Sequence, residues 1–198
     1  MDKSCVSNPT GVVVAGVGGQ GVITLSQLIL GAAWKSGYFA IQSEVHGMSQ
    51  RGGSVNAQII FDKVEVSSPT ILEGTASLII GMEPLEALRY FNLLRKDASV
   101  ICSTSPVRNM PIYPNLDMLI AELKKIDGTF LVDTDKISEE LESKGAGNMV
   151  LLGAASKKLP FTEVIWHQTI KDRFAGKEQS IIDKNIEAFN HGKKLYSM

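Results

Sequence analysis

Cysteine and histidine are scarce in this 198-residue chain, which has two cysteines and three histidines. Two cysteines are too few for a disulfide framework, and without a CxxC pair they cannot supply four thiolates to an iron–sulfur cluster. Cys102 ends an apolar run, so we expect a small core residue there. His46 is the one histidine inside a motif, and with one nearby acid it falls short of the usual metal-ligand set. We therefore expect no metal site in this chain.

Positive and negative charges nearly balance, because the chain has 20 Lys and Arg residues and 21 Asp and Glu residues. Nucleic acids and anionic membranes call for a basic face, so we expect neither as a partner. No stretch approaches the roughly 20 consecutive apolar residues of a membrane helix. The polar start MDKSCVSNPT lacks the apolar centre of a secretory signal. These absences favour a cytoplasmic protein.

Two common catalytic motifs are also missing. The sequence has no GxxxxGK[ST] loop, which excludes a P-loop nucleotide hydrolase. It has no G-x-S-x-G elbow, and no cysteine lies near a histidine, so nucleophilic hydrolase chemistry is not indicated.

The most informative stretch runs from Gly11 to Gly53. An apolar, β-branched run, Val12 to Val17, meets a glycine cluster with the spacing Gly16-x-Gly18-x-x-Gly21. Apolar residues then recur at helical spacing, which predicts a strand, a tight glycine turn and a helix from about Gln20 to Lys35. Such a turn presents helix N–H groups that can bind an anion.

The glycine spacing matches the dinucleotide-binding fingerprint, and a second apolar run ends near Glu44, where that fingerprint places its ribose-binding acid. One reading is therefore a stand-alone NAD- or FAD-binding protein with Glu44 on a ribose. The other is that the glycines serve only the packing of strand against helix.

A dense polar segment follows, SEVHGMSQRGG, which we expect to form a loop over Glu44–Arg51. The planar guanidinium group of Arg51 could bind a carboxylate or phosphate, or it could form an ion pair with Glu44 or with a partner chain. His46 is either a functional group or a structural hydrogen-bonding residue. Gln20 lies where its amide could help to hold an anion.

Further strands and helices alternate along the chain, which predicts one α/β domain over residues 1–198, with residues 1–10 flexible. We expect a Rossmann-like, doubly wound and mostly parallel sheet, an antiparallel hairpin near residues 54–66 at one edge, and a helical C-terminal part. Ligands of such sheets bind beyond the carboxyl ends of the strands, where the glycine turn and the polar loop both emerge. Trp166, Phe161, Phe174 and Phe189 are taken as mild support for an exposed partner face.

Several separated motifs occur together in order: VGGQGV, SEVHGMSQRGGSV, SSP and GMEPLEALRY. In this combination the chain resembles the gamma-type subunit or domain of 2-oxoacid:ferredoxin oxidoreductases, from about Val12 to Phe189. The EVHGMSQRGG form is most similar to the small (beta) subunit of the indolepyruvate branch.

The resemblance implies an enzyme of EC 1.2.7 type that oxidatively decarboxylates a 2-oxo acid such as indolepyruvate or pyruvate. It implies thiamine diphosphate, Mg and iron–sulfur clusters on a large alpha subunit, coenzyme A as co-substrate and ferredoxin as electron acceptor. This chain would then be a non-redox subunit, inactive alone. We expect the following cofactor-binding positions: Gly18, Gly19, Gln20, Gly21, Gln50 and Arg51. His46 and Glu44 are candidates for shaping the shared active site.

Overall fold

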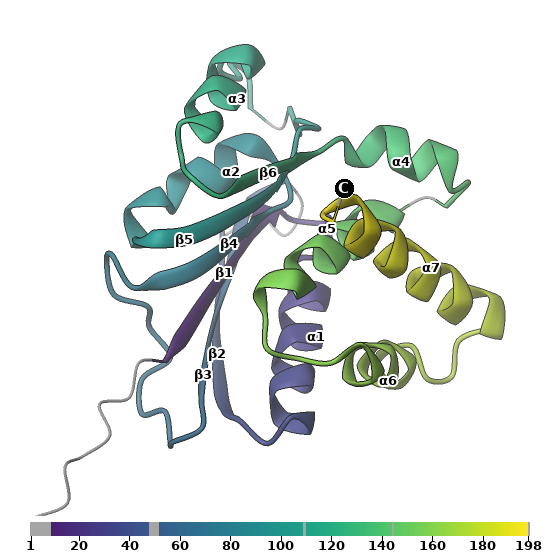
Figure 1. Ribbon diagram of the computed structural model, residues 1–198. Helices are drawn as coiled ribbons and strands as arrows, with labels where there is room; N and C mark the ends of the chain where they lie inside the picture. Colours follow the sequence, from purple (N-terminus) through teal and green to yellow (C-terminus); the bar gives the residue numbers. More distant parts are fainter. Residues whose placement is uncertain (1–8, 48–51, 109, 144, 198) are drawn as a thin grey trace, which may run out of the picture.

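One six-stranded sheet forms the centre of the computed structural model, which describes residues 9–47, 52–108, 110–143 and 145–197 (Figure 1). Its strand order is β2-β3-β1-β4-β5-β6. The strands are β1 (Thr10–Val17), β2 (Phe39–His46), β3 (Ser54–Asp62), β4 (Ala76–Gly81), β5 (Leu94–Ser103) and β6 (Thr129–Val132). The helices are α1 (Val22–Lys35), α2 (Pro84–Arg89), α3 (Leu116–Lys124), α4 (Thr134–Glu140), α5 (Ala146–Ala155), α6 (Glu163–Arg173) and α7 (Gln179–Leu195), with short 3-10 turns at Phe91–Leu93 and Ser156–Lys158.

The apolar run of β1 is buried on both faces of the sheet. Val12 and Val14 point into the larger core, beneath α1 and α5, while Val13 and Ala15 point into the smaller core, beneath α2. A strand covered on both faces needs no polar alternation, which explains the uninterrupted apolar sequence. The predicted doubly wound α/β sheet is confirmed.

Helices lie on both faces of the sheet, in unequal layers (Figure 1). The larger layer contains α1, α4, α5, α6 and α7, and the smaller layer contains α2 and α3. Asn115, Asp133 and Thr162 each accept a hydrogen bond from a backbone N–H in the first turn of α3, α4 and α6. Such capping residues explain why these helices begin where they do.

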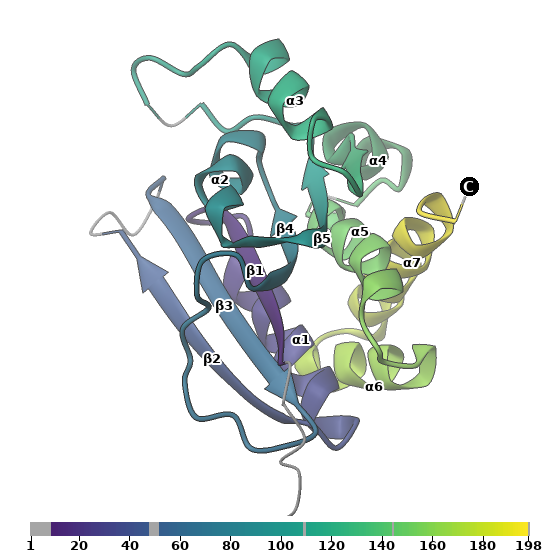
Figure 2. The same ribbon diagram turned by 60° about the vertical axis from the view of Figure 1, so that its left-hand side comes forward.

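The antiparallel hairpin exists, but the sequence prediction placed it wrongly. β2 and β3 form it at one edge of the sheet, with Phe39 opposite Asp62 and His46 opposite Val55 (Figure 2). β3 also runs antiparallel to β1. The stretch 64–66, expected to pair with residues 54–61, is not a strand. Short alternating runs cannot by themselves reveal their partner, and here the partner precedes the glycine-flanked loop.

The aromatic residues of the C-terminal half are part of the core. Trp166 and Phe189 are fully buried, and Phe161 lies between them and Phe61 in a chain of edge-on and tilted ring contacts. The prediction that these aromatic residues support an exposed partner face was therefore wrong. Within the described residues, none of the helices combines the length and the apolar character that crossing a membrane requires.

Helices α5 and α7 approach each other closely through two glycines. A Cβ atom on Gly153 would overlap the carbonyl of Phe189 and lie 2.8 Å from its carbon, and a Cβ on Gly192 would lie 2.8 Å from the Cα of Val150. Both obstacles are backbone atoms, which no rotamer change can move. The two helix backbones are therefore in direct contact.

We predict that Gly153→Ala destabilises the fold by about 3 kcal/mol or more, because overpacking against backbone cannot be relieved locally. Gly31→Ala is the control, since among the described residues its Cβ would meet only the Thr169 methyl group, at 3.1 Å, and alanine is the better helix former. Denaturant unfolding of both variants measures the difference. Equal free energies of unfolding for Gly153→Ala and Gly31→Ala would contradict the backbone contact between α5 and α7.

Candidate functional site

The site predicted from the sequence lies where β1 and β2 end and β3 begins. Val17 is paired with Ser54, and the Gly47 N–H donates to the Ser54 carbonyl at 3.1 Å. The Gly18 N–H donates to the Gly53 carbonyl at 2.9 Å. The glycine turn and the two ends of the 47–53 connection therefore meet at one edge of the sheet, as expected.

Two glycines of the turn have backbone conformations that other residues rarely adopt. Gly19 has φ +105°, is exposed, and a Cβ there would meet no atom of the described residues within 4 Å. Gly21, the N-cap of α1, has φ +92°, and a Cβ there would lie 2.7 Å from the Asn148 amide nitrogen. The first turn of α1 has neither a side-chain cap nor an acidic residue. Its N–H groups therefore keep the partial positive charge of a helix start.

Gln20 acts within the chain. Its Oε1 accepts a hydrogen bond from the Val17 N–H at 2.8 Å, and its Nε2 donates to the Met82 carbonyl at 2.9 Å. The side chain thereby closes the turn and ties it to the connection between β4 and α2. Both polar atoms of the amide are thus hydrogen-bonded to the backbone, and the anion contact expected for Gln20 stays a prediction.

The predicted Glu44–Arg51 loop begins later than expected. Glu44, Val45 and His46 belong to β2, where they pair with Ala57, Asn56 and Val55. Pairing with β3 extends the strand through residues whose polarity had suggested a loop. Gln50 and Arg51 lie outside the described residues, as does the His46 side chain.

The dinucleotide-binding alternative meets a topological obstacle. In the Rossmann arrangement the second strand lies beside the first, so that the acid at its end reaches the ribose of a nucleotide bound at the glycine turn. Here β3 lies between them: Glu44 pairs with Ala57, which pairs with Val14. Glu44 is therefore two strand spacings from β1, about 9–10 Å, and the structure does not favour this alternative.

A pair of buried carboxylates adjoins the turn, and sequence reasoning missed both as site residues. Glu83 and Glu86 stand at the start of α2 and are 1% and 2% exposed. Glu86 accepts from the Ser54 hydroxyl at 2.5 Å and from Arg89 Nε at 3.0 Å. Glu83 accepts from the Glu86 N–H at 2.5 Å and from the Tyr113 hydroxyl at 2.6 Å. Each carboxylate therefore joins α2 to another part of the same edge.

Burial dominates the electrostatics of this cluster. It raises the pKa of Glu83 above the ordinary glutamate value, although hydrogen bonds from Tyr113 and backbone N–H groups oppose the shift. The pKa values of Tyr113 and of the fully buried Cys102 are also raised, in both cases mainly by burial and further by the nearby Glu83. Cys102 is thus a core thiol, as the sequence predicted.

The signal for these carboxylates was present in GMEPLEALRY. Two glutamates three residues apart directly follow a buried strand, at the start of a helix and therefore at the carboxyl edge of the sheet. The proline of this motif indicated where the helix begins, but not that the two glutamates are buried. What the spacing cannot reveal is that Ser54 and Tyr113, from distant segments, would cover both side chains.

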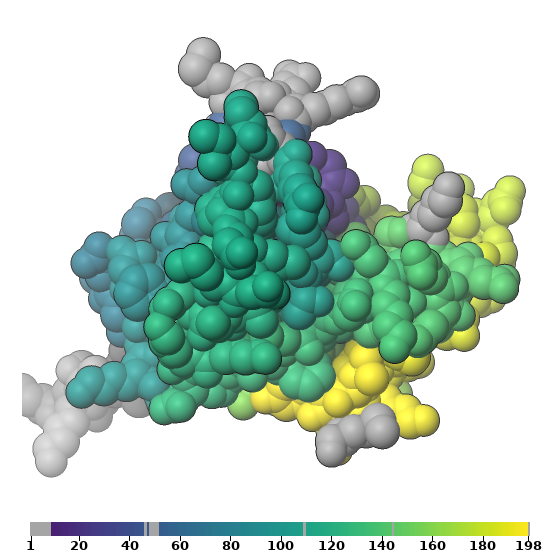
Figure 3. Space-filling view, turned by 90° about the horizontal axis from the view of Figure 1, so that it is seen from above, coloured from purple at the N-terminus to yellow at the C-terminus, as the bar shows by residue number. Residues whose placement is uncertain are grey.

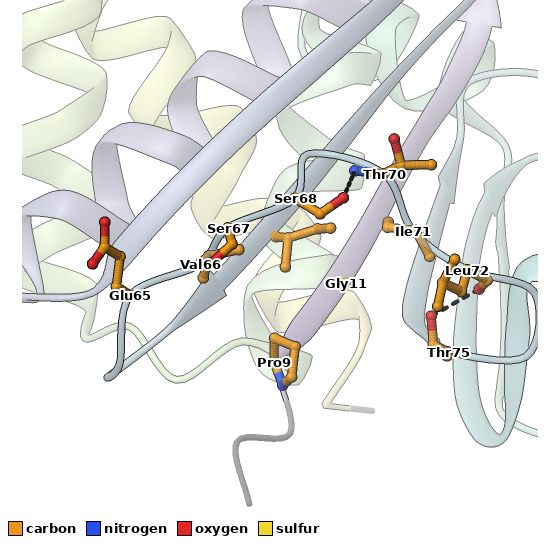
Figure 4. A pocket seen from close by; sticks show the side chains of 11 residues that line it. Pro9, Gly11, Glu65, Val66, Ser67, Ser68, Thr70, Ile71, Leu72 and Thr75 are labelled. Atoms are coloured by element: carbon orange, nitrogen blue, oxygen red, sulfur yellow. Dashed lines mark hydrogen bonds between the residues drawn. The ribbon is translucent and has the colours of Figure 1, made fainter.

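A different hollow lies at the opposite end of β1. It has a volume of about 400 Å³, and its walls are formed by Pro9, Gly11, Ile60 and most residues between 65 and 75, with Ile71 and Leu72 among the apolar members (Figure 4). Seven residue steps along β1 separate its rim from the glycine turn, roughly 23 Å. This hollow is therefore separate from the candidate site. Within the described ranges, no group of three or more His, Cys, Asp or Glu side chains is placed to hold a metal ion.

The raised pKa of Glu83 predicts a pH dependence of folding. A carboxyl whose pKa is raised on folding stabilises the fold fully only below its unfolded pKa, and that contribution is lost as the pH rises through the folded pKa. The free energy of unfolding of the wild type should therefore fall relative to that of Glu83→Gln as the pH rises from about 4.5. Denaturant titrations between about pH 4 and 8 measure this difference.

Glu163→Gln is the control with the opposite sign. Its exposed carboxylate pairs with Lys193, which lowers the pKa of Glu163, so its contribution to stability is lost as the pH falls. Parallel pH profiles of the wild type and Glu83→Gln would show that the Glu83 pKa is not raised.

Relatives of known function match nearly the whole chain. The sequence is 36% identical over 190 residues to indolepyruvate oxidoreductase subunit IorB of Archaeoglobus fulgidus, covering 91% of this chain and 92% of the relative. It is 37% identical over 197 residues to the subunit of the same name from Thermococcus kodakarensis, covering 92% and 94%.

Solved structures share the fold. A 2-oxoglutarate:ferredoxin oxidoreductase of Magnetococcus marinus, solved with 2-oxoglutarate, coenzyme A and succinyl-CoA bound, superposes with a TM-score of 0.76 at 20% identity, over 96% of this chain and 31% of that one. The gamma subunit of a keto/oxoacid ferredoxin oxidoreductase from Geobacter sulfurreducens gives a TM-score of 0.69 at 17% identity, over 95% and 98%.

The family comparison agrees with these relatives and with the resemblance seen in the motifs. Residues 11–195 match the pyruvate ferredoxin/flavodoxin oxidoreductase family, which is almost the full length of the chain. The chain therefore belongs to the pyruvate ferredoxin/flavodoxin oxidoreductase family.

Proposed function

We propose that this chain is the small, non-redox subunit of an indolepyruvate-type 2-oxoacid:ferredoxin oxidoreductase. With a large subunit it would oxidatively decarboxylate an arylpyruvate to the corresponding acyl-coenzyme A and reduce ferredoxin. The observation that supports this most directly is the identity of 34–37% to four indolepyruvate oxidoreductase subunits, over more than nine-tenths of the chain.

The choice of branch rests on a difference in identity. Subunits of 2-oxoglutarate synthase and of pyruvate/ketoisovalerate oxidoreductases are only 26–28% identical to this chain. The gap between these relatives and the indolepyruvate subunits favours an arylpyruvate substrate over a small aliphatic 2-oxo acid. The cytoplasmic location expected from the sequence stays a prediction.

We place thiamine diphosphate, Mg and the iron–sulfur clusters on the large subunit. Two cysteines cannot supply the four thiolates of a cluster, and the chain lacks a Gly-Asp-Gly thiamine motif. Thiamine diphosphate would supply the carbanion chemistry and the clusters would transfer electrons. This chain would contribute binding surface and positioning, and alone it would be inactive.

The edge formed by the glycine turn and the start of β3 is the proposed contact with the large subunit. Gly19 is exposed and open to a close approach, and the uncapped start of α1 would attract a phosphate of coenzyme A or a substrate carboxylate. Gly18, Gln20 and Gly21 would hold the shape of this turn. Gln50 and Arg51 would add donors for the same anion, and Glu44 and His46 would shape the wall of the shared site.

The test of function is co-expression with the large subunit of the same oxidoreductase. We expect indolepyruvate-dependent reduction of ferredoxin or of a dye, in the presence of coenzyme A, only when both chains are present. An NAD or FAD titration of the isolated chain provides the comparison. Dinucleotide binding by this chain, without assembly or activity, would overturn the proposal in favour of the stand-alone cofactor-binding protein.

Gly19→Ala tests the close approach. The methyl group meets no atom of the described residues, so we expect strain of about 1 kcal/mol from the positive φ and a KM for coenzyme A at least tenfold higher in the assembled complex. Gly176→Ala is the matched control, with φ +86° and equally open space, in the connection between α6 and α7. Steady-state kinetics measure the KM for coenzyme A in both complexes. Equal KM values for Gly19→Ala and Gly176→Ala would refute the role of Gly19.

A further inference from the structure

A buried carboxylate holds the first residue of β3. Glu86, which is 2% exposed, accepts a hydrogen bond from the Ser54 hydroxyl at 2.5 Å. Its other oxygen accepts from Arg89 Nε at 3.0 Å, so the buried charge has a cationic partner. A hydrogen bond to a charged group is stronger than one between neutral groups. Ser54 is therefore held firmly against α2, although the two residues are 32 positions apart in the sequence.

The position of Ser54 determines the position of the glycine turn. The residue before it, Gly53, accepts the Gly18 N–H at 2.9 Å through its carbonyl. On the other side of the turn, Gln20 is held by the two hydrogen bonds of its own side chain. Gly19 thus lies between two residues that are fixed by contacts to other segments. A shift of Ser54 would move one of these two supports.

Gly19 is the exposed part of this turn, with φ +105°. In the view from above, purple atoms of the N-terminal part of the described chain reach the surface (Figure 3). Binding geometry must be held within about 0.5 Å of its productive arrangement by supporting hydrogen bonds. Residues that support an exposed turn can therefore change the affinity for a ligand that they do not touch.

We propose that the contact between Ser54 and Glu86 positions the glycine turn for binding an anionic group, so that both are positioning residues of the oxidoreductase. The inference rests on the proposed function, in which the turn binds a phosphate of coenzyme A or the carboxylate of the 2-oxo acid. It adds two residues, which act through the backbone of the turn, to those already assigned to binding.

Ser54→Ala removes the hydroxyl from this contact. In the assembled complex we expect the KM for the ligand that the turn binds to rise about tenfold, while kcat changes less than twofold, because a binding interaction common to the ground state and the transition state affects KM alone. Ser54→Thr keeps a hydroxyl on the same carbon, so its KM should lie within twofold of the wild type. A general loss of structure would produce neither this split nor this rescue.

Ser43→Ala is the matched control. Ser43 is also a partly exposed strand serine, and its hydroxyl donates to a distant segment, at the Pro69 carbonyl, over 3.1 Å. That contact joins β2 to the connection between β3 and β4 and does not involve the glycine turn. We expect the KM values of this variant to lie within twofold of the wild type.

Glu86→Leu tests whether Ser54 acts through Glu86. Leucine removes the acceptor and fills the buried position with an apolar side chain of similar volume, a replacement that folded proteins often tolerate. Thermal unfolding verifies that each variant folds. We expect Glu86→Leu to raise the same KM as Ser54→Ala, and the double variant to raise it no further, because both changes break one contact. Multiplying effects in the double variant would overturn the inferred path.

Two KM values separate the two possible anions. A rise in the KM for coenzyme A alone would assign the turn to a phosphate, and a rise in the KM for indolepyruvate alone would assign it to the substrate carboxylate. Either result supports the positioning role. An equal rise in both would indicate general damage to the active site and would overturn the inference.

The outcomes also distinguish this inference from the proposed function. An active wild-type complex in which Ser54→Ala keeps the wild-type KM values, or in which Ser43→Ala changes them equally, would overturn the positioning role and leave the proposed function intact. A wild-type complex without indolepyruvate-dependent activity would overturn the proposed function, and this inference with it, before any variant is compared.

Discussion

The β4–α2 junction is the point on which the whole carboxyl edge of the sheet depends. Within five residues, Met82 to Glu86, it accepts Gln20 from the glycine turn, Ser54 from the start of β3 and Tyr113 from the β5–α3 connection. Two of the acceptors are buried carboxylates, which cost free energy unless hydrogen bonds satisfy them. Three segments far apart in the sequence are therefore held in one relative arrangement by a single short junction.

Much of this arrangement could be predicted from the sequence, and the failures share one cause. The apolar run of β1, the glycine turn and the helix after it were evident, because local patterns determine them. The extension of β2 through His46 was not, because it depends on pairing with a separate segment, β3, across the 47–53 connection. The placement of β3 between β1 and β2 escaped prediction for the same reason. The buried glutamates were missed because burial depends on Ser54 and Tyr113, which approach from elsewhere.

The motifs identified the family more securely than they identified the atoms of the site. Gln20 illustrates the difference, since its side chain makes two backbone contacts instead of facing outward. A position can matter to a family because it holds the site together. Gln20, Glu83 and Glu86 fit that description, whereas the exposed Gly19 fits direct contact with a ligand or partner. Family resemblance alone does not separate these two kinds of residue.

The glycine contact between α5 and α7 has a mechanical consequence. At Gly153 and Gly192 the two helices touch through their main chains, so at these points they cannot slide past each other without steric overlap. The α5–α7 pair is thus a stiff part of the helical layer that covers this face of the sheet. Because Asn148 of α5 lies against Gly21, a mutation that loosens α5 against α7 would also shift the support of the glycine turn at the far end of the same helix.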